Sequence, residues 1–574
     1  MFTRIFKWVA ATALAASIAT TLTACLSTTE ADGGSPCEKD CTDPDNNHDP
    51  ENSSSSISSE KESPTSSCSS LEKPDTDCEG EPGKPWSGAT AKKFACGSGS
   101  EGNPFVIKTA EQLANLSFVI GAGDEKYVGK HFKLGADIIL NKGEIIDGDG
   151  MPVDSTAELF KWTPIGKSDN APFTGHFDGD GHTISGLFVN TNGRFNGLFG
   201  YCSCTIKNLN IENSWVRGAE SSGAVVGAIE GGSVLKNITV KANVHSTYEN
   251  AGGIVGLASG GTVPAKIEGV ESYGKIYSQY FSGGILGLGS FTEIKDAKNY
   301  ANVGGLRSLG GIVGGLHTSA LTSKTENLGN VSGQQNVGGI VGFHVETGTV
   351  ENSKNSGKVS GNYAVGGIIG DSRSMTIRRV ANTVEISGGS RTGGIAGTAE
   401  NLKMEDVYNT GDIACTEYAG GIIGLNRDGV TRNAYTTGRL TSSPSKFKNV
   451  GVMIGANENT TLADYYYIEQ EVSDTTWSNP LDVTVLVDTV STTPCEITGI
   501  LDTVAFCPEY HTQPVEPVMN ITTWKIPAFG ASDGGVALAK TSEEMRTKNF
   551  AELLGDEFVY DSKKNDGYPV LKWE

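Results

Sequence analysis

Two neighbouring apolar residues recur through the middle of the chain, each time just before a glycine. They belong to the motif Gly-Gly-Ile-(Val/Ile)-Gly, or a close variant, which occurs ten times at steps of 27 to 31 residues. The last glycines of the copies are Gly200, Gly227, Gly256, Gly287, Gly314, Gly342, Gly370, Gly397, Gly424 and Gly455. Such regular steps indicate an internal repeat, and a repeat of this length predicts a solenoid.

The two apolar positions of the motif form two columns. The residue two before the glycine is apolar in every copy, from Leu198 to Met453, and so is the residue one before it, from Phe199 to Ile454. Because successive strand residues face opposite sides, strict alternation would expose one of these columns. We expect a local irregularity such as a bulge to turn both inward; the alternative is an exposed apolar stripe covered by a partner.

Between the motifs lie short β-type segments bounded by glycine, such as residues 357–361, and no sustained helical period. Each unit therefore predicts about three short strands, which can bury their apolar side only by stacking on neighbouring units. The predicted fold is all-β: a right-handed parallel β-helix of about ten coils of 27–31 residues, with small N- and C-terminal caps. Glycines are expected at the corners, where a side chain would clash or φ must be positive.

Other columns keep register with the motif glycine. The asparagines fifteen residues before it are Asn299, Asn327, Asn355, Asn382 and Asn409. Stacked coils lie about 4.8 Å apart, so this column predicts a ladder in which each side-chain amide donates to the next. Nineteen residues before the glycine, Glu351, Arg378 and Glu405 alternate in charge, which predicts cross-strand pairing on an outer face. The glycines from Gly256 to Gly424 should themselves line up along one edge.

The motif Gly197-Leu198-Phe199-Gly200 and its nine relatives resemble the GLUG-repeat proteins of bacterial surfaces. Residues 177–187 resemble the leading coil of such proteins, residues 109–113 their N-terminal capping helix, and residues 558–573 their closing segment. The resemblance implies surface display or adhesion, since the family includes adhesins and modules attached to IgA-cleaving metallopeptidases. None of the eight histidines is followed by Glu, so the His-Glu-x-x-His zinc motif of such a peptidase is missing from the sequence.

The first 24 residues read as a targeting segment. Arg4 and Lys7 precede an apolar, small-residue stretch that ends in Leu22-Thr23-Ala24-Cys25. This resembles a bacterial lipoprotein signal, which implies cleavage before Cys25 and lipidation of its thiol; an ordinary secretory peptide is the alternative. Leu26 after the cysteine resembles the pattern sorted to an outer membrane.

An acidic segment rich in Ser, Pro and Asp follows the signal. Residues 27–90 hold 15 Asp or Glu and 4 Lys or Arg, and we expect a disordered tether there. The predicted organisation is signal 1–24, tether 25–95, N-terminal cap and first coils 96–195, repeat β-helix 196–457, irregular excursion 458–530 and C-terminal cap 531–574. A short helix over residues 542–554, capped by Thr541 or Ser542, is expected to cover the last coil.

The chain has 11 cysteines, of which ten remain after the lipidated Cys25. An exported chain permits disulfides, and the plausible local pairs are Cys37/Cys41, Cys68/Cys78 and Cys495/Cys507. Spacing alone leaves the connectivity open.

Two groups of side chains are candidates for chemistry or binding. Asp178 and Asp180, with His176 and His182, could bind calcium weakly, but Asp-Gly-Asp-Gly is more often a tight turn. The second group is Tyr248, Tyr280, Tyr363 and Tyr418, which could form a strip on which sugars stack. These tyrosines do not share one fixed column in the repeat, which favours scattered surface residues.

Charge and motifs limit the function. The net charge is −22 with 75 glycines in 574 residues, and such an acidic chain is not expected to bind nucleic acid. We expect no cofactor, no catalytic residues and a lipid anchor in the cell envelope, at the outer membrane or cell surface. The first hypothesis is a non-enzymatic protein displaying a surface for adhesion or for a glycan or protein ligand. Alternatives are a β-helix lyase or glycosidase, with its site at 178–182 or 458–530, and a structural envelope protein.

Overall fold

The computed structural model describes residues 78–147, 150–153, 159–441, 449–458, 461–462, 465–468, 471–478, 518–525, 528–532 and 537–574. The chain divides into residues 1–72 and 73–574, and the first of these units lies outside the described residues. The signal segment, Cys25, the tether before residue 78, and the expected pairs Cys37/Cys41 and Cys495/Cys507 also lie outside them.

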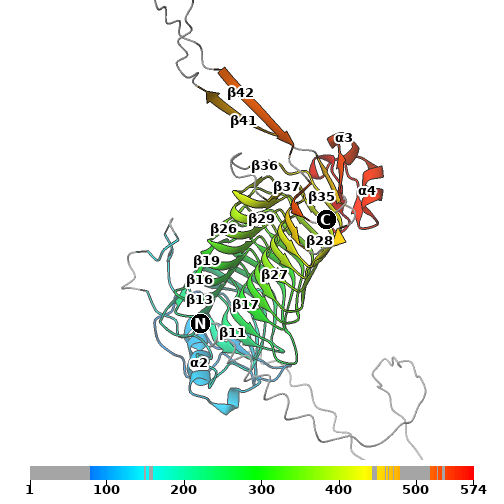
Figure 1. Ribbon diagram of the computed structural model, residues 1–574. Helices are drawn as coiled ribbons and strands as arrows, with labels where there is room; N and C mark the ends of the chain where they lie inside the picture. The colour runs from blue at the N-terminus through cyan, green and yellow to red at the C-terminus, as the bar shows by residue number, and fades with distance from the viewer. Residues whose placement is uncertain are drawn as a thin grey trace, which may run out of the picture. The chain divides into compact units, whose positions relative to one another are not determined.

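Stacked parallel strands confirm the predicted β-helix (Figure 1). The solenoid has about twelve turns, and its strands form one 31-stranded sheet and one 11-stranded sheet. A typical coil contributes one strand to each of three sides, for example β25 (Gly348–Asn355), β26 (Val359–Gly366) and β27 (Ile369–Arg373), and in some coils the strand of the second side is divided into two. Each pairs in parallel with its equivalent one coil later, as β25 does with β28 and β27 with β30.

We number the three sides of the solenoid in chain order. The first side contains β1 (Phe105–Ile107), β2 (His131–Leu134), β3 (Ile138–Ile139), β4 (His176–Asp178), β5 (Thr183–Ser185), β9 (Thr205–Gly218), β12 (Val234–Ser246), β15 (Ala265–Tyr273), β18 (Thr292–Asn299), β21 (Ala320–Asn327), β25, β28 (Met375–Asn382), β31 (Lys403–Asn409), β35 (Val430–Thr436), β39 (Thr461–Leu462), β40 (Tyr465–Ile468) and β44 (Ala537–Lys540). The long strands β9 and β12 continue onto the second side.

The second side contains β6 (Phe188–Asn190), β7 (Phe195–Asn196), β10 (Ser221–Gly223), β13 (Glu249–Gly252), β16 (Lys275–Gly283), β19 (Asn302–Gly310), β22 (Val331–Ser332), β23 (Gln335–Gly338), β26, β29 (Ile386–Gly393), β32 (Ile413–Ala414), β33 (Glu417–Gly420), β36 (Leu440–Thr441) and β37 (Val450–Gly451). The third side is the 11-stranded sheet: β8 (Phe199–Cys202), β11 (Val226–Glu230), β14 (Val255–Ser259), β17 (Leu286–Ser290), β20 (Val313–His317), β24 (Val341–Val345), β27, β30 (Ala396–Glu400), β34 (Ile423–Arg427), β38 (Ile454–Glu458) and β43 (Phe529–Ser532).

Both apolar columns of the motif face the interior, as the sequence interpretation favoured. Ile340 and Val341 are typical, with exposed fractions of 0% each. The chain bends at Gly339 and Ile340, just before β24 begins, so that two consecutive side chains reach the same core. A corner rather than a bulge within a strand therefore explains the pattern, and the alternative of an exposed apolar stripe at these positions is wrong.

The asparagine column forms the predicted amide ladder. The Nδ2 group of Asn327 donates to Oδ1 of Asn355 at 2.8 Å, and that of Asn355 donates to Asn382 at 2.7 Å. The same Nδ2 of Asn355 also donates to the carbonyl of Gly357, two residues along its own chain. The ladder runs from Asn299 to Asn409, and all of its side chains are fully buried. Each amide donates one hydrogen bond to a carbonyl of its own coil and one to the asparagine of the next coil. Polar groups that would otherwise be unpaired in the core are thereby satisfied.

The motif glycines line up coil on coil, and the reason is steric. A Cβ on Gly342 would lie 2.6 Å from the carbonyl oxygen of Gly314, and one on Gly370 equally close to that of Gly342. Neither glycine has a positive φ. The sequence interpretation was therefore right about clashes, but most positive φ angles in the coils are not at glycines.

Three columns of mostly non-glycine residues bend the coils in the left-handed region. One coil uses Lys324, Asn336 and Glu346, and the next uses Asn352, Ala364 and Ser374. Asparagine and aspartate are frequent in these columns because they tolerate this conformation better than other side chains.

The N-terminal cap contains the predicted helix. Helix α2 (Ala110–Gly121) starts after Thr109, whose side chain accepts from Gln112 N while the Gln112 side chain accepts from Thr109 N. The short 3₁₀ helix η1 (Glu125–Tyr127) follows. The apolar face of α2, with Leu113 and Leu116, joins the main core. A capping box of this kind satisfies helix N–H groups that lack an internal partner.

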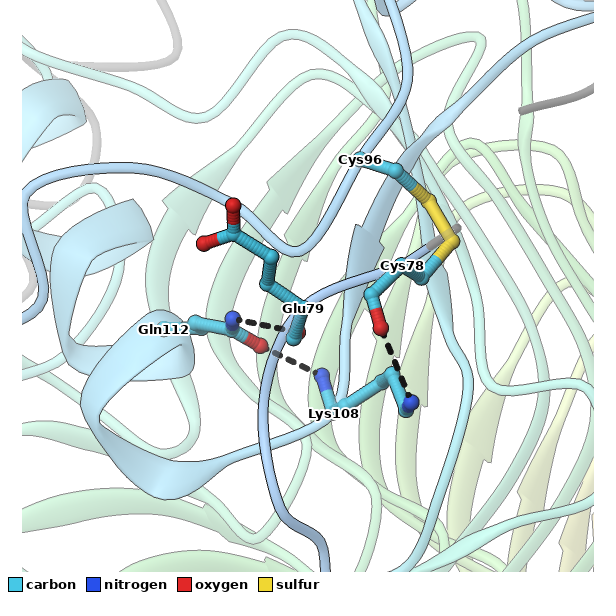
Figure 2. The surroundings of a disulfide bond; sticks show 5 residues. All are labelled: Cys78, Glu79, Cys96, Lys108 and Gln112. Carbon is cyan, nitrogen blue, oxygen red and sulfur yellow. Dashed lines mark hydrogen bonds between the residues drawn. A yellow bond between two sulfur atoms is a disulfide. The ribbon is translucent and has the colours of Figure 1, made fainter. Parts of the chain in front are cut away.

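Residues 78–95 belong to this cap rather than to the expected tether. Phe94 and Ala95 are buried, and Trp86 packs against the main core. Cys78 forms a disulfide with Cys96, so the expected pair Cys68/Cys78 is wrong (Figure 2). The Lys108 ammonium donates to the Cys78 carbonyl at 3.2 Å, which ties the disulfide to the start of α2. A second disulfide joins the buried Cys202 and Cys204.

The C-terminal cap differs from its prediction in shape and in place. Two helices, α3 (Ser542–Met545) and α4 (Lys548–Leu554), replace the single one, with N-caps Thr541 and Thr547. The hairpin β45 (Phe558–Val559) and β46 (Val570–Leu571) and the 3₁₀ helix η4 (Asn565–Gly567) complete it. Its apolar residues pack on Ala381, Tyr408 and Tyr435, which stand in register on the first side of three consecutive coils. The cap therefore covers the flank of the late coils.

The predicted excursion at 458–530 is partly solenoid. Strand β40 extends the first side, and β43 extends the third side. Among the described residues of this region, β41 (Glu471–Ser478) and β42 (Val518–Lys525) lie outside the stack, and they pair with each other in antiparallel fashion. The insertion therefore interrupts one coil between its first and third sides rather than replacing the end of the repeat.

Candidate functional site

A groove of about 960 Å³ lies over the outer face of β1, β2, β4 and β9 and contains the aspartates singled out in the sequence. Asp178 accepts two hydrogen bonds through its Oδ1, from Asp180 N at 2.9 Å and from Asn208 Nδ2 at 3.0 Å. Its other oxygen lies 3.2 Å from the Lys207 ammonium. Burial by itself would raise the pKa of Asp178, but these hydrogen bonds and Lys207 lower it overall.

The local geometry is that of a turn, as the sequence interpretation favoured. Asp180 and Gly181 have φ angles of 51° and 81°, and the Asp178 carboxylate accepts from the backbone two residues on. Asp180 pairs with Lys133 at 3.0 Å, and His182 with Asp137 at 3.0 Å. Among the residues that the structure describes, no group of three or more His, Cys, Asp or Glu could hold a metal ion. The groove is thus a mixed-charge surface with internally paired carboxylates.

Two histidines stack at the edge of the groove. The rings of His131 and His176 lie 4.3 Å apart at 18°, from equivalent positions of β2 and β4. Burial, and then the charge of His176, lower the pKa of His131. The lowered pKa favours the uncharged form of His131, and the two stacked rings form a flat platform.

The four candidate tyrosines gather along one edge of the second side. Tyr280 and Tyr363 share one register column, in which Arg307 and Gln335 stand between them. The ring of Tyr248 contacts that of Tyr280, with centroids 5.6 Å apart. Tyr418 stands one residue after that column, at a left-handed corner with a φ of 56°. The four tyrosines thus lie in three neighbouring columns on several coils, and the rings of Tyr248 and Tyr280 are in contact.

Sequence reasoning missed the residues between the tyrosines. Arg307 is exposed, and its Nε donates to Gln335 Oε1 at 2.9 Å. The Arg391 guanidinium lies 4.6 Å from the centre of the Tyr363 ring, a cation–π arrangement. The signal was available: Tyr280, Arg307, Gln335 and Tyr363 each stand seven residues before a motif glycine. We call Tyr280, Arg307, Gln335, Tyr363 and Arg391 the aromatic–arginine strip.

The comparisons with known proteins agree with the repeat. The model of the family described as "The GLUG motif" matches residues 333–360. A "Putative Gly-rich membrane protein" of Evansella cellulosilytica is 34% identical over 158 residues, which are 27% of this chain and 16% of that protein. "Halomucin" of Haloquadratum walsbyi is 29% identical over 155 residues, 26% of this chain and 2% of that protein. The matched segments are thus small parts of much longer relatives.

One solved structure is matched over most of its length, with low sequence identity and a low TM-score. The crystal structure of "a putative immunoglobulin A1 protease" from Bacteroides ovatus aligns over 84% of this chain and 96% of its own, with a TM-score of 0.29 and 17% identity. Within the described residues, no helix is long and apolar enough to span a membrane. The family match lies on β23, β24, β25 and the start of β26, in the middle of the stacked coils, so the segment similar to the GLUG motif spans about one coil of the β-helix.

Proposed function

We propose that this protein is a lipid-anchored component of the bacterial cell envelope that displays its β-helix as a non-enzymatic binding surface. The observation that carries the proposal is the aromatic–arginine strip, in which Tyr280, Arg307, Gln335 and Tyr363 lie in register, Arg391 lies against Tyr363, and all five side chains are at least partly exposed. This column varies from coil to coil and presents aromatic rings and guanidinium groups outward, as a recognition surface does.

The names of the matched relatives support an envelope location, since one is called a membrane protein and another a mucin. The lipoprotein-like signal ending at Cys25 supports attachment through a lipid. The ligand would be a glycan or a protein of a cell surface, reached while the solenoid remains tethered to its own membrane.

A binding experiment tests the proposal. The full chain in detergent is incubated with whole cells and insoluble polysaccharides, and the bound fraction is measured. We expect Tyr280→Ala with Tyr363→Ala to reduce binding strongly. Tyr273→Ala is the control and should leave binding unchanged. It removes one ring of the stacked pair Tyr273–Tyr300, which belongs to the first side. Absence of binding to every surface would count against display.

The groove at Asp178 favours a second candidate, a polysaccharide lyase or glycosidase. It is open, holds lysines, imidazoles and carboxylates together, and lies on the outer face of a β-helix. Against it, the carboxylates of Asp178 and Asp180 are each paired with a lysine, and the pKa of Asp178 is lowered, which suits neither a proton donor nor a free base. New reducing ends or unsaturated products that disappear in Asp178→Asn would establish this reaction and overturn the non-enzymatic reading.

A further inference from the structure

The arginines of the aromatic–arginine strip differ from two paired arginines on the other sides of the solenoid. Arg378 pairs with Glu351, and Arg427 pairs with Glu458 at 2.9 Å. Arg307 instead bonds an uncharged amide, and Arg391 lies on a ring. Within the described part of the chain, neither of these two guanidinium groups forms an ion pair. Both cations therefore remain available to an anionic ligand.

The floor beside the strip consists of small residues on all coils after that of Tyr280. In the neighbouring outward column, Tyr277 is followed by Gly304, Ser332, Ser360 and Ser387 on successive coils. The hydroxyls of Ser360 and Ser332 are linked at 3.0 Å. Small side chains leave the backbone close to the surface, so an extended chain can lie against it and exchange hydrogen bonds with hydroxyl groups.

The ends of the strip limit where an anion can lie. Glu249 precedes Tyr280 in the same register column, and Glu417 follows Ser390 at the other end. Carboxylates at both ends repel an anionic chain, whereas Arg307 and Arg391 attract it between them. The favourable stretch is therefore bounded along the solenoid axis, from Tyr280 to Ser390.

We propose that this face binds an acidic polysaccharide along the solenoid axis. Its carboxylate or sulfate groups would lie on Arg307 and Arg391, and its sugar faces on Tyr280 and Tyr363. The coil spacing of about 4.8 Å is comparable to the length of one sugar unit in an extended chain, so about four or five units match the stretch from Tyr280 to Ser390. Guanidinium groups suit this ligand because they hold carboxylate and sulfate oxygens in a bidentate fashion. The inference rests on the proposed display function and adds the class of ligand.

Matched polymers test the charge requirement. The full chain in detergent is titrated with polygalacturonate and neutral galactan, and with dextran sulfate and dextran, by calorimetry at low and high salt. We expect binding to at least one acidic polymer, weakened by salt, and no binding to the two neutral ones. The two acidic polymers distinguish recognition of carboxylates from recognition of sulfates. Among oligogalacturonates, affinity should level off at about four or five units, the length set by the coil spacing.

Variants locate the site. Arg307→Gln with Arg391→Gln should weaken acidic-polymer binding about tenfold or more, which is about 1.4 kcal/mol. Arg432→Gln is the matched control, because Arg432 is exposed on β35 of the first side. Unchanged circular dichroism and melting would show that each variant is folded. An equal loss in both variants would overturn the inference, since it would indicate attraction by overall charge.

The outcomes separate this inference from the proposed function. Binding to neutral polymers or to cell surfaces through the tyrosines, with no effect of the two arginines, would overturn the anionic ligand and leave display intact. Absence of binding to every polymer and surface would overturn both.

Discussion

Gly339 shows how little room the coil corner leaves at the scale of one residue. A Cβ at this position would lie 2.1 Å from the Gly367 carbonyl oxygen and 2.4 Å from Cγ of Asn355. We expect Gly339→Ala to lower the free energy of unfolding by about 3 kcal/mol or more, since backbone of the next coil must move. Gly304→Ala is the control, because its Cβ would meet the Tyr277 ring at 3.4 Å and the Ile276 carbonyl oxygen at 4.0 Å, which are ordinary contacts. Urea denaturation measures both, and equal effects would contradict the steric explanation.

His344 is a polar residue inside the same core. It is fully buried on β24, between Leu316 of the previous coil and Ser372 of the next. Burial lowers its pKa from 6.5 to about 4; nearby backbone groups of Arg373 and Thr347 raise it, the charge of His317 lowers it and that of Glu346 raises it. The neutral form is therefore the native one.

The pH dependence of stability follows from that shift. When the pKa of a histidine is lower in the folded state than in the unfolded state, it does not reduce the free energy of unfolding at pH values above 6.5, the unfolded value. The free energy of unfolding then falls as the pH drops from 6.5 towards 4. The loss from His344 should reach about 3 kcal/mol at the acid end, from about 1.4 kcal/mol per pKa unit. His344→Leu, which copies Leu316 one coil earlier, should remove this part of the slope in denaturation curves. Leu316→Met, an apolar exchange at the equivalent position one coil earlier, should leave the slope unchanged.

At the scale of elements, the coils could be predicted more fully than the caps. The asparagine ladder was readable because one residue type returns at a fixed offset, and stacking then dictates the hydrogen bond. Bends at Lys324 or Ala364 were not readable, because stacking forces a left-handed φ on side chains that do not prefer it. The four tyrosines could be named from the sequence, but Arg307 and Gln335 were missed because they break the aromatic pattern, although they share the offset of Tyr280 and Tyr363 from the motif glycine.

The position of the C-terminal cap depended on long-range contacts that no local pattern reveals. Tyr408 and Tyr435 stack at 5.1 Å on the first side, and Phe550 packs edge-on against Tyr435. Glu574 accepts from the Tyr408 hydroxyl at 2.8 Å and pairs with Lys354 at 2.7 Å. Sequence patterns predicted a helix in this region. They did not indicate that Tyr408 and Tyr435, 27 residues apart, form the surface on which the cap packs.

The cap should therefore detach when its aromatic anchor is shortened. Phe550 has an exposed fraction of 3%, and we expect Phe550→Ala to cost about 3–5 kcal/mol, confined to the docking of the cap. Limited proteolysis should then cut between residues 541 and 557 while the coils stay resistant. Leu553→Ala on the same helix, with an exposed fraction of 53%, should leave the pattern unchanged. Simultaneous digestion of the coils would show that the cap is needed for the whole stack.

At the scale of the whole molecule, stability and placement are separate properties. In a solenoid each coil contacts mainly its neighbours, so the stack is held by repeated local contacts and its two caps. Residues 27–90 carry a net charge of −11, half of the total −22, and most of this segment precedes the cap that begins by Cys78. Under the proposed function, attachment to a membrane would depend on the signal and on Cys25 rather than on the coils.

Changing Cys25 should therefore move the protein without unfolding it. The thiol of Cys25 is the expected site of the lipid, so Cys25→Ser should abolish incorporation of labelled fatty acid and shift the chain from the membrane to the soluble fraction. Cys415→Ser is the matched control, because this buried cysteine is in no disulfide among the described residues and lies within the repeat. Circular dichroism of the released Cys25→Ser protein should keep its β signature. Continued labelling and membrane retention would instead identify an ordinary secretory signal or an anchor elsewhere in the chain.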